Sequence, residues 1–142
     1  MSESLAILAS GLFTGAALYV SFVEHPARMQ CGTRLAVTEF APSYKRGAVM
    51  QASLSTIGTL AAIAAWLQGA STSWLIGGLL LGALIPFTLI VILPTNKRLL
   101  DPSLDKDSER AGQLLRRWAK LHAVRSALSV AAFLALLFSL SH

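Results

Sequence analysis

The sequence predicts an all-α integral membrane protein, a four-helix bundle with antiparallel spans. Only 13% of the residues are charged, whereas soluble domains carry roughly 25% charged residues. Hydrophobic residues make up 54% of the chain, and they gather in four runs of about the length that a helix needs to cross a bilayer. The second link between these runs is short, which favours antiparallel neighbours. We therefore expect one transmembrane domain, residues 1–142.

The first predicted span covers about residues 5–23. Glu3 is the only charge ahead of the apolar run, so the basic segment that opens a signal peptide is missing and we expect an uncleaved span. Beyond Glu24, Pro26 either starts a new helical turn or breaks the helix. If the helix continues, Glu24 and Arg28 are four residues apart on one face and can form an ion pair.

Three further spans are predicted at about residues 48–67, 74–93 and 122–140. The second span is rich in Ala, Ser and Thr, and such small residues suit close helix contacts in lipid. Pro86 should kink the third span and free a backbone carbonyl near its middle. That kink could open a pocket on the side of Asn96.

The connectors between the spans carry the charge, with residues 24–47 forming the first and residues 94–121 the third. All 12 Lys and Arg residues lie in these connectors or in the continuation of the third to Arg125, and the second connector and both tails have none. The positive-inside rule puts both basic connectors in the cytoplasm and both termini outside it. Ser108 or Asp107 is the candidate N-cap of the helix that leads into the fourth span.

Charge and targeting signals also bear on location and partners. The short loops and the missing targeting segment indicate a bacterial inner membrane. The net charge of +5 is explained by topology and by anionic lipid headgroups. The chain lacks the basic patch with interleaved aromatic residues that is typical of RNA-binding proteins, so we expect no nucleic-acid partner. The expected partners are the lipid bilayer, a hydrophobic small molecule and a second copy of the chain in a homo-oligomer.

Seven polar or aromatic residues gather at the predicted cytoplasmic ends of the spans. They are Glu24, His25, Arg28, Asn96, Trp118, His122 and Arg125. Trp118, His122 and Arg125 share one helix face, and ionisable residues at membrane depth are costly and usually functional. A site of this composition could hold an apolar, partly acidic molecule, with Arg125 or Arg28 on its anionic oxygen and a histidine as proton acceptor. The alternative is interfacial anchoring, since Arg snorkels and His and Trp favour interfaces.

Metal ligation is a weaker interpretation of the same residues. Glu24, His25 and His122 could form a facial triad for non-haem iron, or the two histidines could ligate haem. However, adjacent Glu24 and His25 point about 100° apart on a helix, and no spacing of paired ligands supports a metal site. The single Cys31 excludes an internal disulfide and a thiolate cluster built from one chain. We expect no metal and no cofactor. His142 has no expected role.

Short motifs in three of the spans, taken in order, carry a family resemblance. The first span holds Gly15, Tyr19 and the segment Glu24-His25-Pro26-Ala27-Arg28, the third closes with Pro94-Thr95-Asn96-Lys97-Arg98-Leu99, and the fourth opens with a segment from Trp118 through His122 to Arg125. Together they resemble the anthrone oxygenase-like family of small four-span membrane proteins, over nearly the whole chain.

The resemblance implies an oxygenase that turns an anthrone into an anthraquinone in a polyketide pathway, without metal or flavin. Many bacterial members of that family have no assigned activity. By match to the motifs, it implies that Asn96, Trp118, His122 and Arg125 are site residues.

We predict catalytic roles for His122, Arg125 and Asn96. His122 would remove a proton from a flat aromatic substrate, Arg125 and Asn96 would stabilise the enolate-type oxygen, and the carbanion would react with oxygen directly. The residues predicted to bind substrate are Trp118, His25, Glu24 and Arg28.

Two other functions stay open on the sequence. The first is a non-enzymatic membrane accessory or lipid-binding protein, in which the polar residues only anchor the bundle at the interface. The second is a haem- or quinone-linked redox protein. Four spans leave little room for a transport pathway, and no acidic residue lies in the middle of a span.

Overall fold

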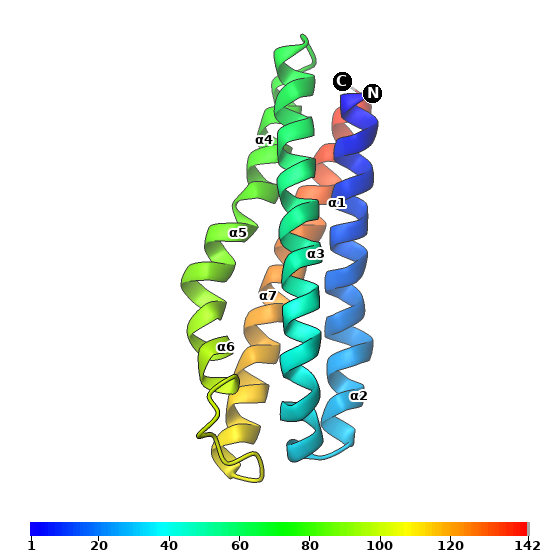
Figure 1. Cartoon of the computed structure of the whole chain (residues 1–142). Helices are drawn as coiled ribbons and strands as arrows, with labels where there is room; N and C mark the ends of the chain where they lie inside the picture. The colour runs from blue at the N-terminus through cyan, green and yellow to red at the C-terminus, as the bar shows by residue number, and fades with distance from the viewer. Residues whose placement is uncertain (142) are drawn as a thin grey trace.

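The computed structural model describes residues 1–141 and shows an antiparallel bundle of four long helices (Figure 1). His142 lies outside the described residues. Within residues 1–141 every regular element is helical, which confirms the predicted all-α bundle. The first and last helices bring the two ends of the chain to the same end of the bundle (Figure 1).

Each of the four helices is long and apolar enough to cross a membrane, so the protein is an integral membrane protein. The first consists of α1 (Ser2–Tyr19), the π-helical turn η1 (Val20–Glu24) and α2 (His25–Gln30), and the second is α3 (Thr33–Leu67). The third consists of α4 (Thr72–Gly82), α5 (Leu84–Phe87), the π-helical turn η2 (Thr88–Ile92) and α6 (Leu93–Leu99). The fourth is α7 (Glu109–Phe138), which ends in the 3₁₀ turn η3 (Ser139–Ser141).

The helices are longer than the predicted spans. Residues 33–47 and 109–121, which the sequence analysis assigned to connectors, belong to α3 and α7. Apolar runs mark only the part of a helix that is apolar on all sides, whereas these ends are amphipathic and bury one face. That face forms a separate core cluster of Ala36, Val37, Phe40, Ile92, Leu99, Ala111, Leu114, Leu115 and Trp118. Ser108 caps α7, as one of the two predicted options, and its Oγ accepts the Ala111 N–H at 3.2 Å.

The chain continues as a helix through Pro26 and through Pro94, in each case after a π-helical turn. The N–H of His25 donates to the carbonyl of Val20, and the N–H of Leu93 donates to that of Thr88, in each case five residues back. Proline lacks an N–H and crowds the carbonyl four residues before it, and a local π turn relieves both problems. Both turns lie beside the cavity described below.

The third helix is interrupted at Ala83, three residues before Pro86, which confirms the predicted kink. The proline cannot donate to the carbonyl of Gly82, so the regular helix ends there. Beyond the break, α5 and α6 swing away from α3 (Figure 1). The bundle is therefore narrow at the end that holds the chain termini and wide at the other end.

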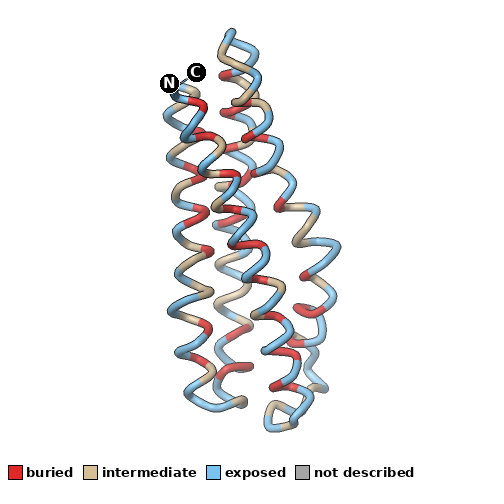
Figure 2. The backbone as a smooth tube through the Cα atoms, turned by 180° about the vertical axis from the view of Figure 1, so that it is seen from behind, coloured by how far each residue is buried: buried red, intermediate tan, exposed pale blue. Residues whose placement is uncertain are grey.

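Small residues close the narrow end. A Cβ atom added at Gly78 would lie 2.7 Å from Cβ of Ala62, and one added at Gly77 would lie 2.7 Å from the side chain of Leu136. These glycines let α4 approach α3 and α7 closely. Buried positions face the inside of the bundle while exposed positions face outward along every helix (Figure 2).

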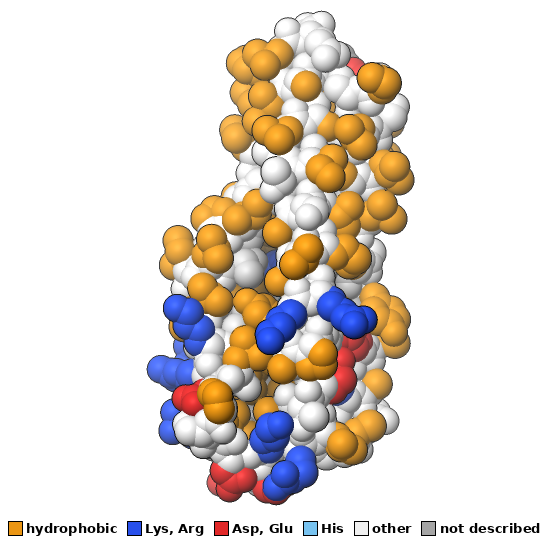
Figure 3. Space-filling model, viewed as in Figure 1, with side chains coloured by type: hydrophobic (Ala, Val, Ile, Leu, Met, Phe, Trp, Pro, Cys, Tyr) orange, Lys and Arg blue, Asp and Glu red, His pale blue; other side chains and the backbone are white. Residues whose placement is uncertain are grey.

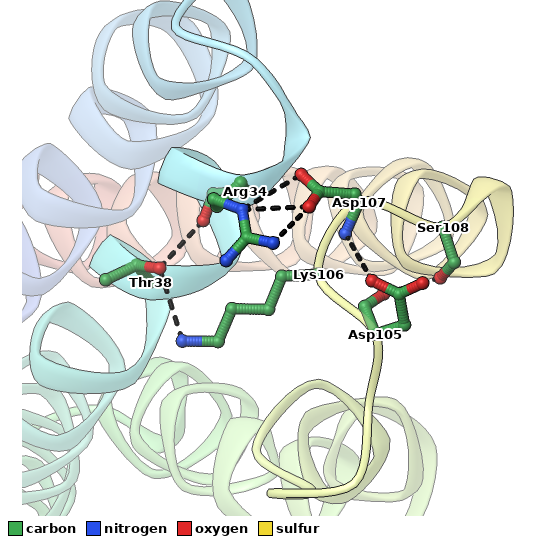
Figure 4. Close-up of polar contacts among 6 residues, drawn as sticks. All are labelled: Arg34, Thr38, Asp105, Lys106, Asp107 and Ser108. Atoms are coloured by element: carbon green, nitrogen blue, oxygen red, sulfur yellow. Dashed lines mark hydrogen bonds and ion pairs between the residues drawn. The ribbon is translucent and has the colours of Figure 1, made fainter.

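The loop between α6 and α7 is fastened to the start of α3 by surface contacts (Figure 4). Arg34 forms an ion pair with Asp107, and Lys106 Nζ donates to Thr38 Oγ1 at 3.3 Å. Inside the loop, the Asp107 N–H donates to Asp105 Oδ1 at 3.0 Å. The hydrogen bonds from Arg34 lower the pKa of the Asp107 carboxyl. The loop is thereby held against the second helix.

Candidate functional site

The divergence of the third helix leaves a cavity of about 920 Å³ in the wide half of the bundle. A volume of this size is in the range of small-molecule sites. All four helices contribute to its largely apolar wall, and its polar lining residues include Glu24, Arg28, Gln51, Asn96, His122 and Arg125. The cavity reaches Asn96, the side on which the Pro86 kink was expected to open a pocket. Figure 3 shows a hollow between the surfaces of α5 and α3, bordered by hydrophobic side chains.

His122 lies on the cavity wall and is only 3% exposed. Its Nδ1 lies 3.0 Å from Ser21 Oγ and 3.4 Å from Ser126 Oγ. Its ring stacks on Trp118, with ring centroids 4.7 Å apart. Contacts at Nδ1 and on the ring face fix the imidazole and leave Nε2 as the nitrogen available to the cavity. This geometry suits a proton acceptor.

Arg125 lies one helical turn beyond His122 on α7 and also lines the cavity. It is 9% exposed, and its Cζ lies 5.1 Å from the centroid of the Phe13 ring. No carboxylate in residues 1–141 forms an ion pair with it, and its Nε finds no hydrogen-bond partner there. A buried cation without a partner is costly, so this guanidinium is placed to receive an anionic oxygen.

Asn96 and Trp118 add further polar atoms to the cavity wall. Asn96 is 1% exposed and Trp118 is likewise buried. Asn96 Oδ1 and Trp118 Nε1 find no hydrogen-bond partner among the described residues. Buried polar groups are normally paired, so each of these two side chains keeps an unused hydrogen-bonding atom beside the cavity. The arrangement combines one proton acceptor, one cation and two neutral polar groups on an apolar wall.

Arg28 has protein partners on several sides. It forms the predicted i,i+4 ion pair with Glu24, and its Nε lies 2.8 Å from Glu39 Oε2. A third contact runs from Nη2 to Ser43 Oγ at 3.3 Å. The Ser43 hydroxyl also donates to Glu24. Of the two arginines predicted as anion ligands, Arg125 is therefore the available one.

His25 is buried but is not among the residues that line the cavity. Its ring packs against Trp118 at 5.1 Å between centroids, so it contacts the cavity wall through the indole. In the described part of the chain, no group of three or more His, Cys, Asp and Glu side chains is placed to hold a metal ion. The triad of Glu24, His25 and His122 considered on the sequence is thus not assembled.

Sequence reasoning missed three polar residues of the site. Ser21 and Ser126 contact the His122 ring, and Gln51 lines the cavity while only 6% exposed. Signals for two of them were present. Ser126 follows His122 by four residues on one helix face, and a glutamine within a span of small apolar residues is costly in a membrane. Nothing in the sequence indicates that Ser21 meets α7.

The fold and the cavity together define a class of protein, a small four-helix integral membrane protein whose largely apolar cavity presents an imidazole and an unpaired guanidinium. Within that class, the chain belongs to the anthrone oxygenase family, which matches residues 40–135. This match confirms the family resemblance predicted from the motifs. The matched range includes Asn96, Trp118, His122 and Arg125.

Two curated relatives are similar over most of their length. An anthrone oxygenase of Claviceps purpurea is 31% identical, with the alignment covering 87% of this chain and 80% of that protein. The anthrone oxygenase tpcL of Aspergillus fumigatus is 26% identical, over 89% of this chain and 84% of that protein. No solved structure matches the chain.

Proposed function

We propose that this protein is an oxygenase that oxidises an anthrone-like substrate, a flat hydrophobic aromatic compound with an acidic methylene group. The observation that carries the proposal is the pair His122 and Arg125, side by side on α7 at the wall of a largely apolar cavity, with no carboxylate of residues 1–141 paired to the guanidinium. Membership in the family and the names of the two relatives support it.

The first chemical step is proton abstraction. His122 Nε2 removes a proton from the methylene group, and the electron pair left on carbon delocalises onto the ring carbonyl as an enolate. Arg125 and the amide of Asn96 stabilise the negative oxygen. The Trp118 indole contributes a flat apolar surface to the wall that the aromatic substrate would contact.

The second step uses dioxygen as the oxidant. The carbanion forms a carbon–oxygen bond with O₂, and the resulting peroxide loses water to leave a carbonyl group. In sum, one methylene group and one O₂ give one carbonyl and one H₂O, so one oxygen atom enters the product and the other enters water. The substrate supplies all the electrons, and the balance requires no separate reductant.

We propose that the substrate reaches the cavity from the bilayer, between α3 and α5. The lining residues include Met50 of α3 and Leu89 of η2, both of which are also exposed on the outer surface of the bundle. An apolar rim of this kind faces acyl chains when the helices span a membrane. A hydrophobic aromatic compound dissolved in the bilayer can enter without crossing water.

For the bacterial inner membrane, we propose an orientation with both termini outside the cytoplasm. Lys and Arg side chains gather at the wide end of the molecule (Figure 3), which would face the cytoplasm. The exposed Cys31, between α2 and α3, lies at this end and provides a test. A membrane-impermeant maleimide should label Cys31 in inside-out vesicles and not in right-side-out vesicles. The reverse pattern would contradict the orientation.

The activity is tested with the purified protein in lipid nanodiscs and a simple anthrone. We expect oxygen uptake and quinone formation in a one-to-one ratio, with one atom of ¹⁸O₂ in the quinone. His122→Gln should abolish the rate above the spontaneous background while helix content and the midpoint of thermal unfolding are retained. His142→Gln is the matched control and should keep the full rate. An undiminished rate in His122→Gln would refute the mechanism.

A further inference from the structure

A chain of hydrogen bonds links the His122 ring to the backbone of α1. His122 Nδ1 lies 3.0 Å from Ser21 Oγ, and Ser21 Oγ lies 2.8 Å from Ser126 Oγ. Ser126 Oγ lies 3.1 Å from the carbonyl oxygen of Ala17 and 3.0 Å from that of His122. This series of hydrogen bonds therefore runs from an imidazole nitrogen through two hydroxyl groups and ends at backbone carbonyls.

The carbonyl end fixes the direction of this chain. A carbonyl oxygen only accepts, so the single proton of Ser126 points toward Ala17 or His122 oxygen. Ser126 Oγ must then accept the proton of Ser21, since the 2.8 Å contact between the two hydroxyls needs a hydrogen. With its proton used, Ser21 can only accept from His122 Nδ1. If the hydrogen bonds ran in the opposite direction, Ser126 would donate its proton to Ser21 and would have no hydrogen left for either carbonyl.

We infer that Ser21 and Ser126 are positioning residues that hold His122 as the neutral tautomer with its proton on Nδ1, so that Nε2 presents a lone pair to the cavity. The consequence for catalysis rests on the proposed function, because only a base needs a free lone pair on Nε2. The tautomer itself is a property of the folded protein and can be measured without any substrate.

The surroundings keep the two serines in place. Thr14 Oγ1 donates to the carbonyl of Ser129 at 3.0 Å, and Ser129 Oγ donates to the carbonyl of Ser126 at 2.7 Å. The Thr14 contact ties α1 to α7 about two turns beyond His122, and the Ser129 contact lies within α7. Ser21 belongs to the π-helical turn η1, and such turns are frequent at functional sites.

The decisive experiment is ¹⁵N NMR of the histidine side chains in selectively labelled, full-length protein at neutral pH. His122→Gln assigns the His122 signals. We expect a protonated Nδ1 and an unprotonated Nε2 in the wild-type protein, and a shift of the proton toward Nε2 in Ser21→Ala and Ser126→Ala. Ser55→Ala, which removes a buried hydroxyl of α3 that donates to the carbonyl of Leu81 at 2.9 Å and has no contact with this network, should leave the tautomer unchanged. A proton on Nε2 in the wild type, a doubly protonated ring, or an unchanged tautomer in both alanine variants would overturn the inference.

Kinetics with an anthrone then separates this inference from the proposed function. In Ser21→Ala, kcat should fall by about tenfold or more, but by no more than the roughly 10²–10⁴-fold that a general base supplies, and KM should stay nearly constant. Ser21→Thr retains a hydroxyl and should restore both kcat and the tautomer. If the spectra show the expected tautomer but the wild type consumes no oxygen, the proposed function fails and the tautomer assignment stands. If oxygen is consumed but Ser21→Ala matches the wild type in rate and spectrum, the positioning role fails alone.

Discussion

The Trp118 indole stacks on the His122 imidazole, with ring centroids 4.7 Å apart and ring planes inclined by 24°. Phe40 meets the same indole edge-on at 5.3 Å. The imidazole of His122, the candidate base, therefore packs against Trp118, and Phe40 of α3 packs against Trp118 in turn. A histidine supported in this way keeps one orientation toward the cavity, which is what proton transfer requires.

Trp118→Ala should lower the free energy of unfolding by about 3–5 kcal/mol, because it removes a large buried side chain that packs on two helices. Trp118→Phe should cost much less and keep the stacking on His122. Reversible unfolding in mixed detergent measures the difference. Trp66→Ala is the control, since Trp66 is 37% exposed at the end of α3. Equal losses in the Trp66 and Trp118 variants would contradict the packing role of Trp118.

Arg125→Met should separate stability from activity. The Arg125 guanidinium is buried, and no carboxylate of residues 1–141 neutralises it. Methionine is apolar and of similar length, so the substitution should leave the midpoint of thermal unfolding unchanged or raise it. The rate of anthrone oxidation should fall by about 10²–10³-fold, as when one oxyanion ligand is lost. Arg110→Met, at the exposed start of α7, should change neither quantity. A strongly destabilised Arg125→Met protein would show that the guanidinium has a structural role.

Gly78→Ala should destabilise the narrow end of the bundle. The new methyl group would lie 2.7 Å from Cβ of Ala62, which is fixed to the backbone of α3. Overpacking of this kind costs about 1–3 kcal/mol. Gly15→Ala is the matched change, because its methyl group would have no neighbour within 4 Å. If both variants unfold at the wild-type temperature, the close approach of α4 to α3 is wrong.

The contribution of Asp107 to stability should disappear in acid. Its hydrogen bonds with Arg34 lower the pKa of the carboxyl in the folded protein below its ordinary value of 3.8. The ionised form therefore stabilises the fold above pH about 3.8, and this effect is lost as the pH falls through the lower folded pKa. Unfolding of wild type and Asp107→Asn, compared from pH 7 downward, should show a small difference that vanishes in acid and shrinks with added salt. A difference that grows as the pH falls would contradict the ion pair.

The sequence predicts the architecture well because its main signals are local. Apolar runs locate the helices, Pro86 locates the kink, and Ser108 marks the start of α7. The stripe of Trp118, His122 and Arg125 follows from helical spacing alone. These features depend on neighbours within one or two turns of the same helix.

Features that depend on partners from other helices were not predictable. The sequence makes Arg28 a candidate anion ligand, whereas the structure pairs it with Glu39, which lies in the segment predicted to be a connector. Ser21 meets Ser126 only because α1 and α7 are rotated to face each other. His25 was expected to contact substrate, but it packs on Trp118 instead of lining the cavity. Interhelical rotation is set by the whole core, which no short motif records.

The apolar rim between α3 and α5 has a consequence for how this protein must be assayed. If substrate enters between Met50 and Leu89, as proposed, it comes from the bilayer, and the reaction rate should follow the mole fraction of substrate among lipid or detergent molecules. Adding empty micelles at constant total substrate should slow the reaction, although the amount of substrate per volume of solution is unchanged. This behaviour is known as surface dilution, and where it is observed the Michaelis constant has to be expressed per amount of lipid or detergent and not per litre of buffer.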